Sequence, residues 1–208
     1  MKTIFTTSCF ILILAGTVSA QENSHFTFDI GGGFTTPVGN TGRYLDNGWN
    51  IGAGAGWNFT PYVGALIQTN YNSLGINSST LSNLGAPGGG VHVFSATLDP
   101  VIHLHPRGHF DPYIVGGGGL YHEYQNLTAP TVVGGGYGYG FGGFGYYPGE
   151  VILSSYSVNK PGANIGAGIS LGTKWHAKFY AEARWNHVFG TYNGTRMDFV
   201  PATFGVRW

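Results

Sequence analysis

The chain is poor in charge. Only 9% of its 208 residues are Asp, Glu, Lys or Arg, and the formal net charge is zero, whereas roughly 25% of an ordinary soluble domain is charged. Without an excess of basic residues, nucleic acid is not expected as a partner. Because 42% of the residues are hydrophobic, the composition does not indicate disorder either. We therefore expect the charge to be missing from a surface that does not face water.

Cysteine is almost absent. The only one, Cys9, lies in a basic and then apolar segment, with an apolar run at 10–15 and small residues up to Ala20. This pattern predicts a cleaved secretory signal peptide over 1–20 and one mature domain over 21–208. Once Cys9 is removed, neither a disulfide nor a cysteine-linked lipid anchor is expected, and we expect no cofactor.

Long hydrophobic runs are also missing. The mature chain has no stretch of about 18 apolar residues, which argues against transmembrane helices, and no 3.6-residue periodicity, so we expect no helices. Strict alternation is present instead, most clearly over 48–72. Apolar residues from Trp49 to Phe59 alternate with glycine and asparagine, Thr60 and Pro61 break the run, and alternation resumes. This pattern predicts an antiparallel hairpin of two strands, each of about ten residues.

The same alternation recurs along the chain and predicts eight strands. We expect them at 25–34, 49–59, 62–71, 91–105, 113–124, 163–175, 178–189 and in a last segment ending at 208. Their apolar faces carry large aromatics and their other faces carry glycine and amides, which suits lipid outside and a narrow lumen inside. Apart from helices, only a closed sheet satisfies its backbone in lipid. The predicted fold is therefore all-β, an eight-stranded antiparallel up-and-down transmembrane β-barrel.

The expected connections alternate in length. Those at 60–61, 106–108 and 176–177 are tight, whereas those after the first, third, fifth and seventh strands are long. Short periplasmic turns and long external loops are typical of outer-membrane barrels. The longest expected loop, 125–161, contains a tract of Gly, Tyr and Phe with no apolar periodicity. It is a candidate surface for an external ligand, and a merely flexible loop is the alternative.

Three segments carry a family resemblance. The run DPYIVGGG at 111–118, the strand YAEARW at 180–185 and the ending FGVRW at 204–208 resemble the small eight-stranded outer-membrane β-barrels of the OmpA, OmpX and OmpW type. We expect a monomer in the lipid of a Gram-negative outer membrane. The resemblance implies that the closing Trp208 is part of the signal read by the barrel-assembly machinery. Trp49, Trp175 and Trp208 are expected at the membrane interfaces, where aromatic side chains concentrate.

Four charged side chains are expected to point into the lumen. They are Asp29, Glu182, Arg184 and Arg207. Opposite charges in so narrow a space favour a buried polar network that fills the barrel, and a selectivity filter is the alternative. The predicted inward faces are also rich in glycine, which suggests that part of the lumen is hollow. The inward glycines are Gly52, Gly54, Gly56, Gly166, Gly168 and Gly172.

His103, His105 and His109 suggest a metal site. Two imidazoles two residues apart share a strand face, as zinc ligands often do. These histidines border a turn, however, and neither cysteine nor a carboxylate cluster accompanies them in the sequence. We expect no metal.

The resemblance also suggests a lipid-modifying enzyme, because some small barrels of this type carry a His-x-Ser pair on a late strand. Here His187 is followed two residues later by Phe189, so the nucleophile is absent. The serines at 154, 155 and 157 lie in the expected long loop without an evident base. The sequence therefore predicts no catalysis and a structural or surface-interaction role. The alternative is a narrow channel or transporter for small or apolar solutes.

Overall fold

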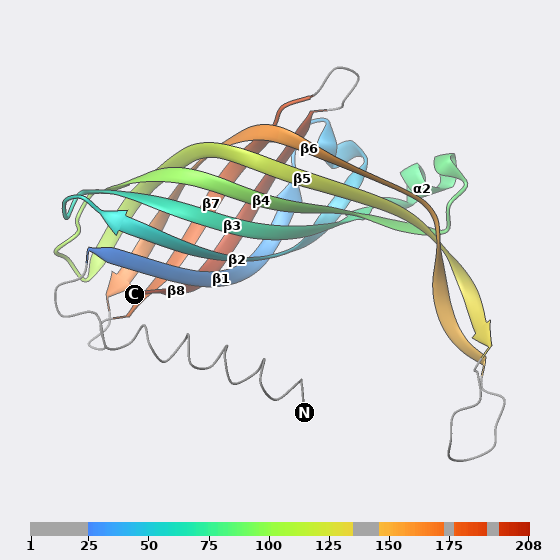
Figure 1. The fold of residues 1–208 in the computed structure, drawn as a ribbon, viewed down its shortest axis with the longest axis horizontal. Coiled ribbons are helices and arrows are strands. Elements are labelled where there is room, and N and C mark those ends of the chain that lie inside the picture. Colours follow the sequence, from blue (N-terminus) through green and yellow to red (C-terminus); the bar gives the residue numbers. More distant parts are fainter. Residues whose placement is uncertain (1–24, 135–145, 173–176, 191–195) are drawn as a thin grey trace, which may run out of the picture.

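The structure is a computed structural model that describes residues 25–134, 146–172, 177–190 and 196–208. Eight antiparallel strands, each hydrogen-bonded to its neighbours in sequence order, form a closed barrel (Figure 1), which confirms the predicted fold. The strands are β1 Phe26–Pro37, β2 Leu45–Asn58, β3 Val63–Ile76, β4 Gly88–His103, β5 Phe110–Gly134, β6 Tyr146–Gly172, β7 Lys178–Val188 and β8 Met197–Arg207. The predicted signal peptide and Trp175 lie outside the described residues.

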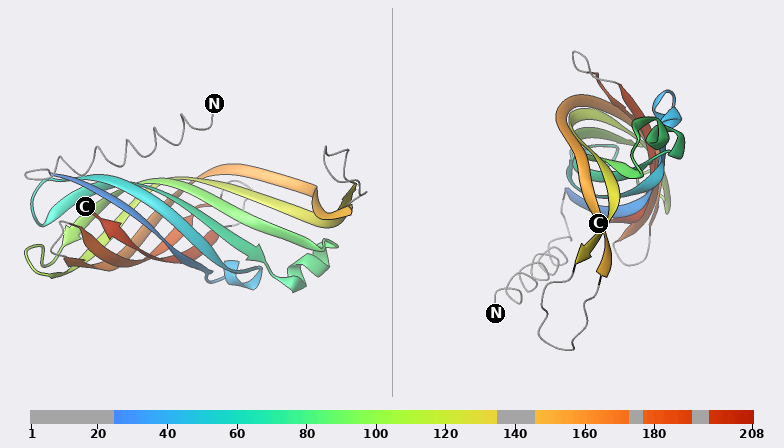
Figure 2. Two further views of the ribbon diagram at one scale, coloured as in Figure 1. Left: turned by 90° about the horizontal axis from the view of Figure 1, so that it is seen from below. Right: turned by 90° about the vertical axis from the view of Figure 1, so that its right-hand side faces the viewer.

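The barrel closes between its first and last strands. β1 and β8 pair from Asp29 opposite Arg207 to Pro37 opposite Phe199. Beyond that register the backbones of Phe28 and Trp208 exchange two hydrogen bonds, of 3.1 and 2.8 Å. The end-on view in Figure 2 shows the resulting ring of strands. Closure leaves no free sheet edge in the wall, which is the condition for a sheet to span lipid.

Side chains alternate between the two faces of the wall as the sequence predicted. On β2, Trp49 and Ile51 are 52% and 51% exposed on the outside, whereas Asn50 between them is 3% exposed inside. On β7 the outward Phe179 and Trp185 are exposed and the inward Arg184 is buried. An apolar exterior around a polar interior reverses the arrangement of a soluble protein and matches a barrel surrounded by lipid.

Two short helices contradict the expectation of a helix-free chain. η1 spans Thr41–Arg43 and α2 spans Ser78–Leu84 in the connection between β3 and β4. Asn77 caps α2 by accepting a 2.8 Å hydrogen bond from the Thr80 N–H, and Gly85, at φ +64°, ends it. A helix as short as α2 is defined by its capping residues and has no apolar stripe. The search for a 3.6-residue hydrophobic periodicity therefore did not reveal it. Among the described residues, no helix is long and apolar enough to cross a membrane.

The prediction that residues 125–161 form one long loop was wrong. β5 and β6 continue as a paired ribbon up to Gly134 opposite Tyr146, and Figure 1 shows this hairpin projecting well beyond the barrel wall. A register shift between Leu127 and Thr128 interrupts the pairing and marks a bulge, a feature that bends and twists a ribbon. A two-stranded ribbon exposed on both faces needs no apolar periodicity, so the sequence pattern missed it. We call residues 128–134 and 146–152 the arm.

Candidate functional site

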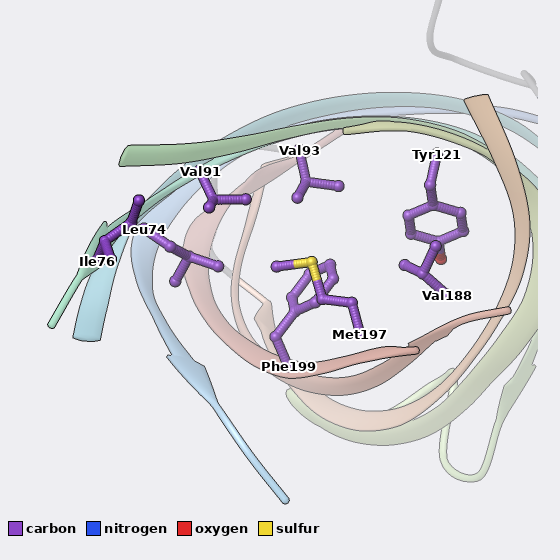
Figure 3. Packing of buried hydrophobic residues seen from close by; sticks show 8 residues of the cluster. All are labelled: Leu74, Ile76, Val91, Val93, Tyr121, Val188, Met197 and Phe199. Carbon is purple, nitrogen blue, oxygen red and sulfur yellow. The ribbon is translucent and has the colours of Figure 1, made fainter. Parts of the chain in front are cut away.

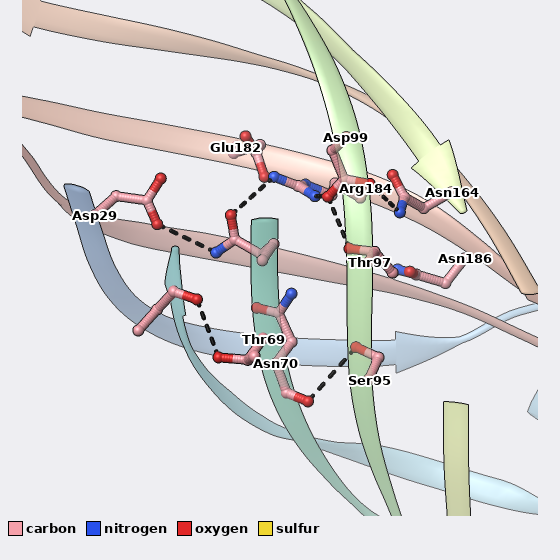
Figure 4. Close-up of polar contacts among 12 residues, drawn as sticks. Asp29, Thr69, Asn70, Ser95, Thr97, Asp99, Asn164, Glu182, Arg184 and Asn186 are labelled. Atoms are coloured by element: carbon pink, nitrogen blue, oxygen red, sulfur yellow. Dashed lines mark hydrogen bonds and ion pairs between the residues drawn. The ribbon is translucent and has the colours of Figure 1, made fainter. Parts of the chain in front are cut away.

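The four charged residues expected in the lumen come together inside the barrel. Arg207 Nη2 lies 3.2 Å from Asp29 Oδ2 and 4.0 Å from Glu182 Oε2. Arg184 Nε donates a hydrogen bond to Glu182 Oε1. All four are at most 9% exposed, and the close-up in Figure 4 shows three of them, Asp29, Glu182 and Arg184, near one another.

A fifth charged residue, Asp99, completes this lumen network. Arg184 Nη1 lies 2.6 Å from Asp99 Oδ2. Thr97 donates to the same oxygen, and Asn164 donates to Asp99 Oδ1 (Figure 4). Asp99 lies on the inward face of β4, but sequence analysis did not pair it with Arg184, because alternation gives the face of a strand and not the contacts across the lumen. The network therefore contains three carboxylates and two guanidinium groups.

Two tyrosines enclose the guanidinium of Arg207. Its Cζ lies 4.8 Å from the centre of the Tyr113 ring and 4.9 Å from that of Tyr180, distances that suit cation–π contacts. The Tyr113 hydroxyl donates a 2.9 Å hydrogen bond to Glu182. Rings and charges thus form one packed layer across the barrel.

The expectation that inward glycines leave a hollow was wrong for the middle of the barrel. A Cβ on Gly168 would lie 2.5 Å from the Tyr113 ring, and one on Gly166 would lie 2.7 Å from Arg184 Cγ. The glycines therefore make room for large side chains of neighbouring strands. A cavity at this level, lined by residues that include Glu182 and Arg184, measures about 10 Å³, which is barely the space of one water molecule.

An apolar cluster fills the lumen toward the end with the long connections. Figure 3 shows its side chains pointing into the barrel from β3, β4, β5, β7 and β8. Its members are Leu74, Ile76, Val91, Val93, Tyr121, Val188, Met197 and Phe199. Val93, Tyr121 and Phe199 are fully buried. The lumen is thus packed both by charged residues and, further along, by apolar ones.

The opposite end of the lumen is open. A cavity of about 420 Å³, which we call the vestibule, is bordered by Phe26, Thr60, His103, Lys178, Arg207 and Trp208, among others. Arg207 belongs to both the vestibule and the lumen network. The vestibule therefore ends where the packed layer begins.

The three histidines considered as metal ligands do not converge. His103 Nδ1 lies 2.6 Å from Asp111 Oδ2, and the backbone N–H of His105 donates to Asp111 Oδ1 at 3.1 Å. In the part of the chain that the structure describes, no set of three His, Cys, Asp or Glu side chains is arranged to hold a metal ion. These contacts instead tie the β4–β5 turn together.

The residues weighed for catalysis lie apart from one another. His187 Nδ1 lies 2.6 Å from Asp198 Oδ1, and its ring packs edge-on against Phe189 with the ring centres 5.0 Å apart. Ser154, Ser155 and Ser157 are exposed on β6. The absence of catalysis stays a prediction.

Aromatic side chains gather on the outer face near both ends of the barrel. Trp49, Tyr71, His92 and Tyr124 form a row across β2 to β5, with successive ring centres 5.4, 5.9 and 6.0 Å apart. At the short-turn end, Trp57 packs edge-on against Phe26, and the ring of His25 stacks on Trp57 with the ring centres 5.4 Å apart. Such aromatic girdles occur at the membrane–water interfaces of outer-membrane barrels.

The chain is similar in fold to solved outer-membrane protein structures. Neither a family model nor a curated protein matches this chain. Among solved structures, it is similar to Neisserial surface protein A, with a TM-score of 0.56, 12% identity and coverage of 88% of this chain and 96% of that one. It is also similar to a major outer membrane protein from Thermus thermophilus, with a TM-score of 0.54, 8% identity and coverage of 90% and 99%.

An outer membrane protease, OmpT from Escherichia coli, aligns with a TM-score of 0.48, 12% identity and coverage of 90% and 97%. At these identities the likeness concerns the fold alone. The barrel seen here and its similarity to the first two structures confirm the resemblance to small eight-stranded outer-membrane barrels.

Proposed function

We propose that the protein is an outer-membrane β-barrel with a structural or surface-interaction role and no catalytic activity. The observation that carries the proposal is the packed lumen, whose middle retains a cavity of only about 10 Å³. Eight strands enclose an interior just wide enough for side chains to fill, whereas open aqueous pores are found in barrels of about 16 strands. A wall closed in this way anchors its loops and the arm rather than passing solute.

The apolar exterior of the barrel supports a location in the outer membrane. A wall with exposed Phe, Trp, Leu and Ile on the outside is favourable only in lipid, because water would solvate it poorly. Residues 1–20 serve as the cleaved signal peptide in this proposal. The chain inserts as a monomer with the help of the barrel-assembly machinery, and Trp208 contributes to the signal that the machinery reads.

The arm and the adjoining part of β6 are the proposed contact surface. Among the described residues, the pairing of β6 with β7 begins at Gly162, so that edge of β6 has no β7 partner from Tyr146 to Tyr156. Val151, Ile152, Leu153 and Tyr156 are 47–59% exposed there. A long edge with apolar side chains and few charges is a favourable site for contact with another protein.

Two measurements test the proposal. Purified protein in planar bilayers should show no steady conductance comparable to that of a general porin; porin-like conductance would exclude the packed lumen.

Replacing 128–152 by a two-residue turn should leave the barrel folded, which its heat-dependent gel mobility reports, and should abolish any adhesion of expressing cells to surfaces. Adhesion equal to that of the complete chain would exclude the arm as the contact surface.

The alternative function is a narrow channel or transporter for small or apolar solutes. The vestibule favours it, because about 420 Å³ of cavity already reaches Arg207. Passage would require both the layer of Arg184 and Arg207 and the apolar cluster beyond it to move. The same conductance measurement distinguishes the two functions.

A further inference from the structure

The vestibule has the size and the chemistry of a small-molecule site. Its volume of about 420 Å³ falls within the range of roughly 300–1,000 Å³ typical of ligand pockets. Leu66 and Val101 line one part of it, and exposed turn residues including Thr60 and Pro61 stand at its mouth. It therefore offers an apolar wall, polar groups and access from the short-turn end.

The acidic side chain in the vestibule is already engaged. Asp111 is 1% exposed, and its two carboxylate oxygens face His103 Nδ1 and the His105 N–H at 2.6 and 3.1 Å. Asp111 is thus used to hold the turn and offers little to a bound cation. The cationic Arg207 at the inner end faces Asp29, so that pair is neutral overall.

Lys178 is the charged side chain at the border of the vestibule that is not engaged in an ion pair described above. It stands at the start of β7, half-buried, with its side chain bordering the vestibule. Among the residues that the structure describes, no side-chain carboxylate lies within ion-pair distance of its ammonium group. An ammonium group in a recess partly shielded from water gains most from an anionic partner that enters the recess.

We propose that the vestibule binds a small organic anion from the short-turn side, with its carboxylate or phosphate on Lys178 and its carbon body against Leu66 and Val101. Two features favour an anion over a cation. The carboxylate of Asp111, which borders the vestibule, already faces His103 Nδ1 and the His105 N–H, whereas the ammonium group of Lys178 has no side-chain carboxylate within ion-pair distance among the described residues. The proposal does not depend on the arm or on whether the lumen conducts.

The test uses two probes of nearly equal length and opposite charge, succinate and butane-1,4-diamine. Binding to the full mature chain in lipid nanodiscs is measured by calorimetry. Succinate should bind saturably with one molecule per chain, and the diamine should not. Lys178→Met, which keeps most of the length of the side chain and removes its charge, should weaken succinate binding about tenfold, the loss expected for one charge-assisted hydrogen bond.

Arg107→Met is the matched control, because Arg107 is an exposed cation on the β4–β5 turn at the same end and does not border the vestibule. It should leave succinate affinity unchanged. Thr60→Trp, which leaves Lys178 intact and narrows the mouth, should also abolish binding, so the proposal can be tested even if Lys178→Met does not fold. Absence of saturable succinate binding to the wild type, equal affinity of a folded Lys178→Met, or preference for the diamine would overturn the proposal.

Discussion

Asp29 and Arg207 face each other in register across the seam between β1 and β8, and their side chains meet inside the barrel at 3.2 Å. The first and last strands are thus joined both by backbone hydrogen bonds and by a buried ion pair. The two residues are 3% and 6% exposed. Removing one partner of such a pair leaves the other charge buried without compensation.

We therefore expect Asp29→Ala to lower the free energy of unfolding by about 3 kcal/mol. Urea unfolding from lipid vesicles, followed by tryptophan fluorescence, measures this change. The double variant Asp29→Ala, Arg207→Leu should recover part of the loss, because no unpaired charge remains at the seam. If the double variant were less stable than the single one by the full cost of losing Arg207, the two side chains would be acting independently.

A second prediction concerns the glycines that receive large side chains. Gly168→Ala places a methyl group 2.5 Å from the Tyr113 ring and should destabilise the barrel by about 1–3 kcal/mol through overpacking. Gly172→Ala on the same strand is the control, since its methyl group would meet nothing closer than 3.7 Å. The same unfolding measurement should show little change for the control; equal losses would mean that strand glycines matter for another reason.

The orientation can be tested with single cysteines, because the only natural one, Cys9, lies in the predicted signal peptide. Ser155 is exposed on β6 near the arm, and Thr60 is exposed in the turn at the opposite end. In intact cells, a membrane-impermeant maleimide should label Ser155→Cys and should not label Thr60→Cys. Labelling of Thr60→Cys should appear only after the outer membrane is opened, and the reverse pattern would invert the proposed orientation.

Alternation predicted the strand number and the two faces of the wall, because a side chain that faces lipid is apolar and one that faces the lumen is mostly polar or small. Trp49 and Asn50 needed no knowledge of distant residues to be placed correctly. The pairing of Arg184 with Asp99 depended on which strands oppose each other across the barrel, and this is fixed by closure and register. The arm was missed for a related reason, because its strands are held by each other and not by a buried face.

The last prediction concerns charge in the lumen network. Arg184 contacts Asp99 and Glu182, and the network holds Asp29, Asp99 and Glu182 against Arg184 and Arg207. Arg184→Ala leaves three carboxylates with one guanidinium group and removes the bulk that Gly166 accommodates. Water and cations are then favoured in the space, since unpaired buried carboxylates are costly without a counter-ion.

We expect the Arg184→Ala barrel to be less stable and to show a small cation-preferring leak where the wild type conducts poorly. Planar-bilayer currents under a KCl gradient measure both the conductance and, from the reversal potential, its ion preference. Arg184→Met is the control, because it restores part of the bulk but not the charge and should leak less than Arg184→Ala. The apolar cluster beyond the network limits the leak, so Phe199→Ala combined with Arg184→Ala should conduct more than either change alone. Anion preference, or a wild-type current as large as that of the variants, would contradict a lumen closed by these side chains.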